Sequence, residues 1–526
     1  METDVTTTLD QLSDLAAEAT VCAERPPLVV TSPLNGLTLG AVPAGTPDDV
    51  ALAGERARRA ASQWAAWPVQ RRCAVIARYR DLLVTQREEL LDLVHAENGK
   101  ARVAALEEYL DAVLTAGYYA KFAPRHLAPQ RRRGALPTLT STRVAYQPKG
   151  VVGIITPWNY PLTLVSSDAV AALAAGNAVI LKPDSQTPLT ALALLRLARQ
   201  AGLPRDVFQI VTGAGATLGE PLLDQVDHLM FTGSTATGRV LAEQCGRRLI
   251  SCAAELGGKN ALLVLADAPL QRAVDGAVQA CFSNTGQICA GIERVYVHKD
   301  VYDAFKVAFV AKAKALRLGT GPGYDVDLGP LINQAQLEKV QAHVADAVAK
   351  GAKVLTGGEV RDDIGPLFFE PTVLVGVTDQ MKLAREETFG PVVALYQVAD
   401  DAEAIARAND TDYGLNAAVW SGSLAHGRAV AARLRSGGVN VNEGYAAVWG
   451  STDAPFGGVG ASGLGRRHGP EGIREYTEPQ TVAAQRLMPA GQPPWLSRET
   501  YAVVMTAAVH WLHVTGGQLL GKVMGR

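Results

Sequence analysis

Between Gly150 and Ser234 the chain alternates short apolar segments with segments of helical periodicity. The apolar segments are rich in branched residues, are bounded by turn residues, and lie at 151–155, 178–181, 208–211 and 229–231. Helical patterns separate them, as at 167–175 and 189–200. Strands that are apolar on both faces and joined through helices are typical of a parallel sheet with helices on both sides. The alternation therefore predicts an α/β fold.

A second region of the same kind follows Gly258. Its pattern predicts strands at 261–264 and 295–297 and helices at 270–282 and 301–316, and it continues to Asn442. A chain of 526 residues, 48% of them hydrophobic, is long enough for two or more domains with large cores.

Three polar motifs directly follow predicted strands of the first region. Ligands of parallel α/β sheets bind beyond the carboxyl ends of the strands, so these motifs are candidates for a binding site. They are Pro157-Trp158-Asn159, Lys182-Pro183-Asp184-Ser185 and Gly233-Ser234. A strict G-x-G-x-x-G fingerprint is absent, because in the segment 213–219 the second gap is one residue longer.

The segment 283–291 places Cys289 in a Gly-containing turn of small and polar residues. Glu255 lies 34 residues upstream, directly before Leu-Gly-Gly-Lys. A thiol nucleophile and a carboxylate base are groups used in covalent catalysis at a carbonyl. Considered alone, a cysteine is more often a small buried hydrophobic residue, and this interpretation is kept for the other five cysteines.

Five separated motifs, taken in this order, resemble those of the aldehyde dehydrogenase superfamily. They are the segments 157–159, 231–234, 254–260, 283–291 and 387–391. The resemblance covers roughly residues 43–487 and is closest to the NADP-dependent succinate-semialdehyde dehydrogenases of actinobacterial type, in the runs 141–160, 182–188 and 465–472. It implies NAD(P)-dependent oxidation of an aldehyde to a carboxylic acid, with succinate semialdehyde as the expected substrate.

The resemblance also implies a Rossmann-type coenzyme domain, an α/β catalytic domain and a small oligomerisation sheet. We expect the coenzyme domain at 1–127 and 149–257, the catalytic domain at 258–473, the oligomerisation arm at 128–148 and 474–490, and a C-terminal extension at 491–526. An edge strand in such an arm gains its missing hydrogen bonds from a partner subunit. A homo-oligomer, dimer or tetramer, is therefore expected.

Roles for individual residues follow from the same resemblance. Cys289 is expected to be the nucleophile and Glu255 the base that activates water, while the Asn159 amide and the Cys289 backbone N–H stabilise an oxyanion. The coenzyme is expected to bind through Pro157, Trp158, Lys182, Asp184, Ser185, Gly213, Gly233, Ser234, Leu256, Glu387 and Phe389. No metal is expected.

NADP is the expected coenzyme, with NAD also possible. Many NAD-preferring relatives carry a glutamate three residues after the lysine found here as Lys182. That carboxylate binds the ribose hydroxyls and repels a 2′-phosphate. In this chain the position is Ser185, which is neutral, although the neighbouring Asp184 could take the same role.

Two further predictions concern charged residues. A related group binds a substrate carboxylate with an arginine at the position that is Ser167 here, so the candidate cations are Arg466, Arg467 and His468. The acidic residues of the predicted helix 101–122 are interpreted as a solvated face, and they are Glu107, Glu108 and Asp111.

Composition excludes some functions. The net charge of −2 at pH 7 offers no basic surface for nucleic acid. Six cysteines are too sparse for a disulfide framework, which indicates a reducing compartment. The N-terminal residues lack the basic and apolar regions of a secretory signal, so a cytoplasmic location is expected.

The C-terminal segment 500–521 contains no Asp, Glu, Lys or Arg. Its length is near that of a membrane-spanning helix, but two histidines, Gly516-Gly517 and Gln518 dilute its apolar character. A packed or interfacial helix is favoured over a membrane anchor. This segment leaves open an alternative function, a broad or fatty aldehyde dehydrogenase with peripheral membrane contact through 500–526. A second alternative, independent of this segment, is a catalytically inactive dinucleotide-binding structural protein.

Overall fold

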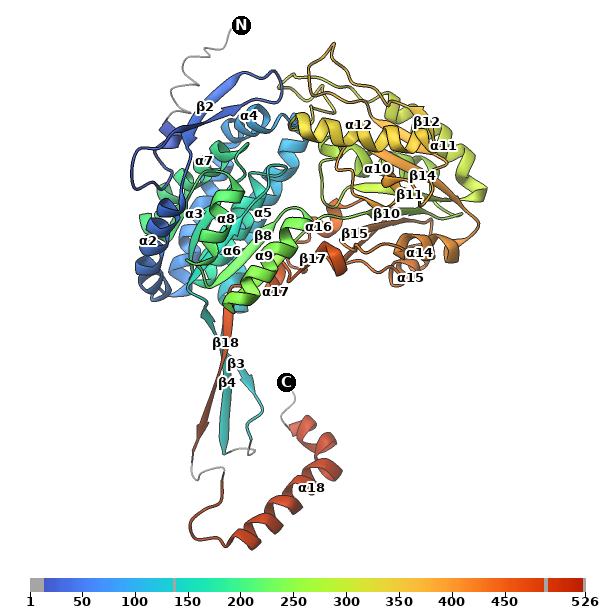
Figure 1. Ribbon diagram of the computed structural model, residues 1–526. Coiled ribbons are helices and arrows are strands. Elements are labelled where there is room, and N and C mark those ends of the chain that lie inside the picture. The colour runs from blue at the N-terminus through green and yellow to red at the C-terminus, as the bar shows by residue number, and fades with distance from the viewer. Residues whose placement is uncertain (1–13, 136–138, 487–490, 524–526) are drawn as a thin grey trace. The chain divides into compact units, whose positions relative to one another are not determined.

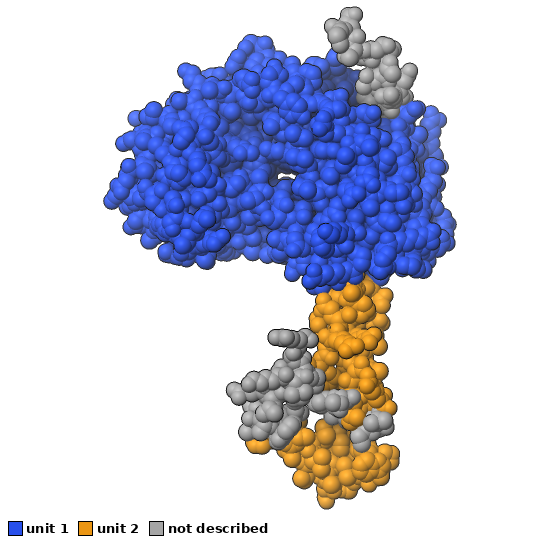
Figure 2. All heavy atoms as spheres, turned by 180° about the vertical axis from the view of Figure 1, so that it is seen from behind, with its two compact units in different colours: residues 1–126, 148–477 blue, residues 127–147, 478–526 orange. Residues whose placement is uncertain are grey.

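The computed structural model describes residues 14–135, 139–486 and 491–523. The chain divides into two compact units, which Figure 2 shows in different colours. Unit 1 comprises residues 1–126 and 148–477, and unit 2 comprises residues 127–147 and 478–526.

A six-stranded sheet forms the core of the first half of unit 1 (Figure 1). Its order is β17-β9-β8-β5-β6-β7; the strands β5 to β9 are parallel, and β17 is antiparallel to β9. The strands are β5 (Val151–Ile155), β6 (Ala178–Lys182), β7 (Phe208–Ile210), β8 (His228–Thr232), β9 (Ser251–Glu255) and β17 (Gly463–Leu464). Every residue of β5 to β8 is buried, because helices cover both faces of the sheet.

The helices around this sheet come from the N-terminal segment and from the crossovers. They are α2 (Pro47–Ala65), α3 (Val69–Thr85), α4 (Arg87–Asn98), α5 (Arg102–His126), α6 (Thr163–Ala175), α7 (Pro188–Gln200), η1 (Arg205–Val207), α8 (Gly215–Leu223) and α9 (Thr235–Arg248). Val50 and Ala53 of α2 and Leu218 of α8 belong to one apolar cluster with Ile180 of β6. A short hairpin of β1 (Pro27–Thr31) and β2 (Thr38–Pro43) precedes α2.

A seven-stranded sheet forms the second half of unit 1, in the order β12-β13-β14-β11-β10-β15-β16. All neighbouring strands are parallel except β12 and β13. The strands are β10 (Asn260–Val264), β11 (Ile292–His298), β12 (Lys353–Thr356), β13 (Thr372–Val375), β14 (Val392–Val398), β15 (Asn416–Trp420) and β16 (Gly438–Val441).

Two apolar clusters cover the two faces of this second sheet. Residues alternate along β10: Leu262 and Val264 join the cluster that contains Phe305, and Leu263 joins the cluster that contains Val340. The helices and turns are α10 (Leu270–Phe282), η2 (Ser283–Gly286), α11 (Lys299–Lys314), α12 (Gln334–Ala349), α13 (Lys382–Arg385), α14 (Asp401–Asn409), α15 (Leu424–Ala431), α16 (Ala446–Trp449), η3 (Gly460–Ser462) and α17 (Gly469–Arg474).

Unit 2 contains a three-stranded sheet and the C-terminal helix. The sheet order is β18-β4-β3, with β3 (Gln130–Arg132), β4 (Thr140–Pro148) and β18 (Thr477–Gln485). Most residues of β18 are exposed. The helix α18 (Arg498–Val523) also exposes apolar side chains in its first half, among them Val503, Val504 and Val509. None of the helices in the described ranges combines the length and apolar character needed to cross a membrane.

The predicted α/β fold is confirmed, and the six strands expected from the sequence in the two regions overlap β5, β6, β7, β8, β10 and β11, whereas β9 was not predicted. The predicted boundary at 257/258 separates β9 from β10, but β17, within the predicted catalytic segment 258–473, belongs to the first sheet. The division into coenzyme and catalytic domains stays a prediction. One interpretation is wrong. Glu108 and Asp111 do not form a solvated face but are buried, because they bind the start of α6: Glu108 accepts the backbone N–H of Leu162 and Thr163, and Asp111 accepts the Thr163 hydroxyl.

Candidate active site

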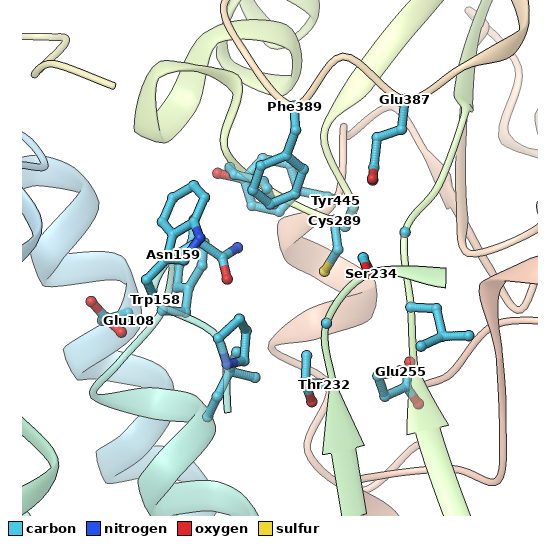
Figure 3. A pocket seen from close by; sticks show the side chains of 18 of the residues that line it. Glu108, Trp158, Asn159, Thr232, Ser234, Glu255, Cys289, Glu387, Phe389 and Tyr445 are labelled. Carbon is cyan, nitrogen blue, oxygen red and sulfur yellow. The ribbon is translucent and has the colours of Figure 1, made fainter. Parts of the chain in front are cut away.

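A cavity of about 240 Å³ lies beyond the carboxyl ends of β5, β8 and β9. Figure 3 shows the Cys289 sulfur at its centre, with Asn159 and Trp158 on one side and Ser234 and Glu255 on the other. Ten of the predicted site residues line it: Asn159, Glu255, Cys289, Pro157, Trp158, Gly233, Ser234, Leu256, Glu387 and Phe389. The fold thus brings residues that are up to 232 positions apart in the sequence to one cavity.

The turn before Cys289 has an unusual backbone. After α10, three successive residues have positive φ: Asn284 (49°), Thr285 (56°) and Gly286 (71°). Left-handed backbone is costly for residues with a Cβ, so two of the three store strain. A Cβ added at Gly286 would lie 2.0 Å from the carbonyl oxygen of Gly390, so only glycine fits at that position. The strained turn passes close beside the 387–391 loop.

Side-chain amides hold the backbone around Cys289. Asn260 Nδ2 donates to the carbonyl oxygens of Cys289 (2.7 Å) and Gly291 (2.8 Å), and Asn416 Nδ2 donates to that of Ala290 (2.8 Å). Each of these amides is buried, so the hydrogen bonds replace water for the turn. Asn260 ends the motif 254–260 but had no predicted role, and Asn416 lies in none of the motifs, since a single sequence gives no pattern for such supports.

The enclosed position of Cys289 controls its protonation. Burial raises the pKa of the thiol to about 12; the guanidinium of Arg467 lowers this pKa, and the carboxylates of Glu255 and Glu387 raise it. At neutral pH the thiol therefore carries its proton, and the reactive thiolate forms only when a base takes that proton.

Glu255, the last residue of β9, is a buried carboxyl group near Cys289. Its Oε2 has no hydrogen-bond partner in the described part of the chain. Burial raises the pKa of Glu255 to about 8, against the lowering effect of Arg467, while Asp168 raises it further. A Cβ at Gly457 would lie 2.6 Å from Glu255 Oε1, so the backbone approaches this carboxyl group closely. The group can exchange a proton near neutral pH.

Asn159 follows β5, and hydrogen bonds to the backbone carbonyl oxygens of residues 158 and 159 hold it in place. Its carbonyl oxygen accepts a hydrogen bond from Lys100 Nζ at 2.7 Å, and the carbonyl oxygen of Trp158 accepts one from Asn98 Nδ2 at 2.7 Å. The side-chain Nδ2 of Asn159 donates to the carbonyl oxygen of Gln287 at 3.0 Å. The amide is thus directed toward the turn that carries Cys289.

The 387–389 segment is fixed by two carboxylates. Glu293 accepts the backbone N–H groups of Thr388 and Phe389, both at 2.9 Å, and pairs with the buried Lys259. Glu387 accepts the backbone N–H of Gly258 at 2.9 Å, and burial raises its pKa to about 7. The Phe389 ring meets the Trp158 ring edge-to-face at 5.6 Å between centroids.

Four predicted coenzyme residues do not line the cavity but lie at the ends of β6 and β7: Lys182 is the last residue of β6, Asp184 and Ser185 follow it, and Gly213 follows β7. Lys182 Nζ is buried, donates to the carbonyl oxygens of Pro183 (2.6 Å) and Gly213 (3.4 Å), and forms no ion pair within the described ranges. Asp184 Oδ1 accepts the backbone N–H of Gln186 at 2.9 Å.

These groups fit a dinucleotide. A buried ammonium group without an ion pair is suited to a phosphate, which would compensate its charge. Gly233 and Ser234 lie at the start of the 14-residue helix α9, where free backbone N–H groups and the helix dipole favour an anion. Ser234 caps this helix by accepting the N–H of Thr237 at 3.3 Å.

The cavity wall also contains residues to which no role was assigned from the sequence. Four of them lie within the named motifs, Thr232, Gly257, Ile288 and Ala290, and eight lie outside them: Glu107, Glu108, Tyr160, Leu164, Gln336, Lys339, Tyr445 and Trp449. Glu107, interpreted from the sequence as solvated, instead accepts a hydrogen bond from the Tyr445 hydroxyl at 2.8 Å. The three candidate cations for a substrate carboxylate, Arg466, Arg467 and His468, do not line the cavity. Arg467 is buried and donates to Asp168 (3.0 Å) and Thr232 (2.9 Å).

The chain is similar to known proteins over most of its length. Residues 21–482 match the model of the aldehyde dehydrogenase family. A protein of Mycobacterium ulcerans named putative succinate-semialdehyde dehydrogenase, NADP(+), 2 is 54% identical over 92% of this chain and 94% of its own length.

Two solved structures are also similar to this chain over most of its length. The crystal structure of succinate-semialdehyde dehydrogenase from Burkholderia pseudomallei has a TM-score of 0.84 and 36% identity, covering 88% of this chain and 95% of that one. A betaine aldehyde dehydrogenase from Staphylococcus aureus in complex with NAD+ has a TM-score of 0.86 and 30% identity, covering 93% of this chain and 100% of that one.

The strained turn generates a prediction about stability. Gly286→Ala should lower the free energy of unfolding by roughly 1–3 kcal/mol, because the new Cβ meets the Gly390 carbonyl in a left-handed backbone. Gly246→Ala is the matched control: it lies in α9 and its Cβ would meet no atom within 4 Å. Thermal unfolding should show a lower midpoint for Gly286→Ala and an unchanged or higher one for Gly246→Ala; equal midpoints would contradict the account of this turn.

Proposed function

The chain belongs to the aldehyde dehydrogenase family, and from this premise we propose that it oxidises succinate semialdehyde to succinate with NADP, using Cys289 as the nucleophile. One observation carries the chemistry: Cys289, Glu255 and Asn159, from three separate segments, line a single cavity. The names of the relatives at 54% and 36% identity support the substrate and the coenzyme. The retention of all three groups speaks against an inactive structural protein.

The first step forms a bond between the Cys289 sulfur and the aldehyde carbon. The thiol gives its proton to a water molecule, and the thiolate adds to the carbonyl to give a thiohemiacetal whose oxygen becomes negative. Asn159 Nδ2, which already points at the Cys289 turn, and the backbone N–H of Cys289 are the proposed donors to that oxygen. One such donor is typically worth about 3 kcal/mol of barrier.

A bound coenzyme would supply the hydride acceptor, so that the thiohemiacetal carbon on Cys289 would lose a hydride and become a thioester. We assign Glu387 and Phe389 to the nicotinamide ribose and ring, with Pro157, Trp158 and Leu256 beside them. Gly233 and Ser234 are assigned to the pyrophosphate. Lys182, Asp184, Ser185 and Gly213 are assigned to the adenosine end, where Lys182 supplies a positive charge.

Water then releases the acid, and Glu255 is the proposed base. Its burial and its unpartnered Oε2 leave a carboxylate oxygen available to accept a proton from water. Because burial raises its pKa to about 8, the base is protonated and inactive in a growing fraction of molecules as the pH falls below that value.

The assembly of the chain is part of the same proposal. We assign β4 and β18 to an oligomerisation arm that pairs with another subunit, in a dimer or tetramer, since the exposed edge of β18 offers unpaired backbone groups. The contact of residues 500–526 with a membrane surface and the cytoplasmic location stay predictions.

The reaction is tested with purified protein, NADP and succinate semialdehyde, following the absorbance of the reduced coenzyme. Wild type should form NADPH, and Cys289→Ala should lower the rate by several orders of magnitude while binding the coenzyme almost normally. Cys22→Ala is the control, because Cys22 is exposed and lies outside the cavity. Residual turnover of Cys289→Ala above about a tenth of wild type would rule out its role as nucleophile.

Deacylation is tested with Glu255→Gln, which keeps the shape of the side chain but cannot accept a proton. A single-turnover burst of NADPH should survive, steady-state turnover should collapse, and mass spectrometry should detect the trapped thioester. In wild type, steady-state turnover should rise with pH and level off above about pH 8, as Glu255 loses its proton. Normal turnover by Glu255→Gln, with no thioester, would refute the assignment.

Coenzyme preference is tested at Ser185. A carboxylate introduced by Ser185→Glu would repel the 2′-phosphate of NADP beside Lys182, so the preference should move toward NAD, mainly through a higher KM for NADP. Gln186→Glu places the same charge one residue further on as a control. The proposal fails if wild type has the higher kcat/KM with NAD, or if Ser185→Glu leaves the ratio unchanged.

A further inference from the structure

Two cysteines outside the cavity lie together where α9 leads into β9. Cys245 is in the last turn of α9 and is buried, and Cys252 is the second residue of β9 and is partly exposed. Cys245 belongs to the apolar cluster between the first sheet and its helices, and Cys252 packs against that cluster. Neither residue lines the cavity, and the proposed reaction uses neither of them.

We propose that Cys245 and Cys252 form a site of reversible oxidation, at which a peroxide converts the two thiols to a disulfide. This modification is independent of the proposed aldehyde oxidation. It concerns two residues that the sequence analysis interpreted as small hydrophobic residues without further chemistry. In a reducing compartment such a disulfide is transient, because cellular thiols reduce it again, and it then reports the presence of an oxidant.

The first argument is the contact between the two sulfur atoms. The Cys252 thiol donates a hydrogen bond to the Cys245 sulfur, so the two side chains point toward each other, as a disulfide requires. The turn between them is tight. Leu249 has a left-handed backbone (φ 54°), and the N–H of Ile250 donates to the carbonyl oxygen of Cys245 at 3.2 Å. This turn holds the end of α9 against the start of β9.

The second argument is the unequal protonation of the two thiols. The hydrogen bond from Cys252 lowers the pKa of the Cys245 thiol, burial raises it, and the guanidinium of Arg248 lowers it. The same hydrogen bond and burial raise the pKa of Cys252. Cys245 is therefore the thiol that loses its proton more readily, and the thiolate is the form that reacts with a peroxide.

The oxidation takes place in two steps. The Cys245 thiolate attacks one oxygen of hydrogen peroxide and the O–O bond breaks, which gives a sulfenic acid on Cys245 and a hydroxide that takes up the proton Cys245 lost. The Cys252 sulfur then attacks the Cys245 sulfur, and the sulfenic oxygen leaves as water with the proton of Cys252. Two thiols and one hydrogen peroxide thus give one disulfide and two waters. The sulfurs lose two electrons, and the peroxide gains them.

The third argument comes from the surroundings of the cysteines. Cys252 is partly exposed, so a small oxidant can reach the pair from its side. The other four cysteines have different neighbours. Cys22 contacts an arginine side chain at 3.1 Å, Cys73 a backbone carbonyl oxygen at 3.7 Å, Cys281 is packed in an apolar cluster of the second sheet, and Cys289 lines the cavity.

The test uses the purified full chain, first reduced, then treated with hydrogen peroxide, alkylated and digested with trypsin. Cleavage after Arg247 and Arg248 separates the two cysteines into the peptides 240–247 and 249–259. In wild type the two peptides should be recovered as a linked pair, whose mass is their sum less two hydrogen atoms, and dithiothreitol should separate them. If both peptides are recovered unlinked from peroxide-treated wild type, the inference is overturned.

Two variants complete the experiment. Cys252→Ser should abolish the linked pair and leave a sulfenic acid on Cys245 that dimedone labels; an unlabelled Cys245 would overturn its assignment as the thiol that attacks the peroxide. Cys73→Ser is the matched control, because Cys73 is also a buried cysteine, and it should give the same yield of linked peptide as wild type. The readout contains no aldehyde, so its outcome and that of the proposed function are separate.

Discussion

Two buried lysine–glutamate pairs hold the loops that surround Cys289. In one, Glu108 pairs with Lys100 and accepts the N–H groups of Leu162 and Thr163. In the other, Glu293 pairs with Lys259 and accepts those of Thr388 and Phe389. A buried pair adds little net stability over apolar residues, but removing one partner typically costs about 3–5 kcal/mol. The pairs therefore hold the loops at defined positions, because their hydrogen bonds are directional and apolar packing is not.

The same burial that fixes the loops sets the proton chemistry of the cavity. Desolvation raises the pKa of Cys289 to about 12 and that of Glu255 to about 8, and the buried Arg467 opposes both shifts. Arg467 is itself held by Asp168 and Thr232, so its charge lies at a fixed place behind the wall. A cavity without this cation would hold both groups more firmly in their protonated forms, which are the forms without nucleophilic or basic character.

The sequence predicted the elements that have a local signature. Branched apolar runs located β5 and β6, and polar motifs at strand ends located Asn159 and Ser234, because the carboxyl ends of parallel strands share one edge. The family resemblance located Glu255, whose strand β9 was not predicted. It did not predict what depends on distant partners. Helical periodicity cannot distinguish a solvated carboxylate from one that binds another helix start, which is why Glu108 was misassigned. The left-handed Asn284 and the support from Asn260 likewise depend on contacts remote in sequence.

Ser167 belongs to a network of polar groups between α5 and α6. Ser167 is buried and lies 3.1 Å from the Thr163 hydroxyl, and both face the Asp111 carboxylate. A guanidinium at this position would have to displace that hydroxyl network. The helix α6 contributes no basic side chain to the cavity, whose wall on this side is lined by Glu107 of α5 and Leu164 of α6. The reacting groups are those of any aldehyde oxidation, so the selection of the aldehyde falls to these wall residues.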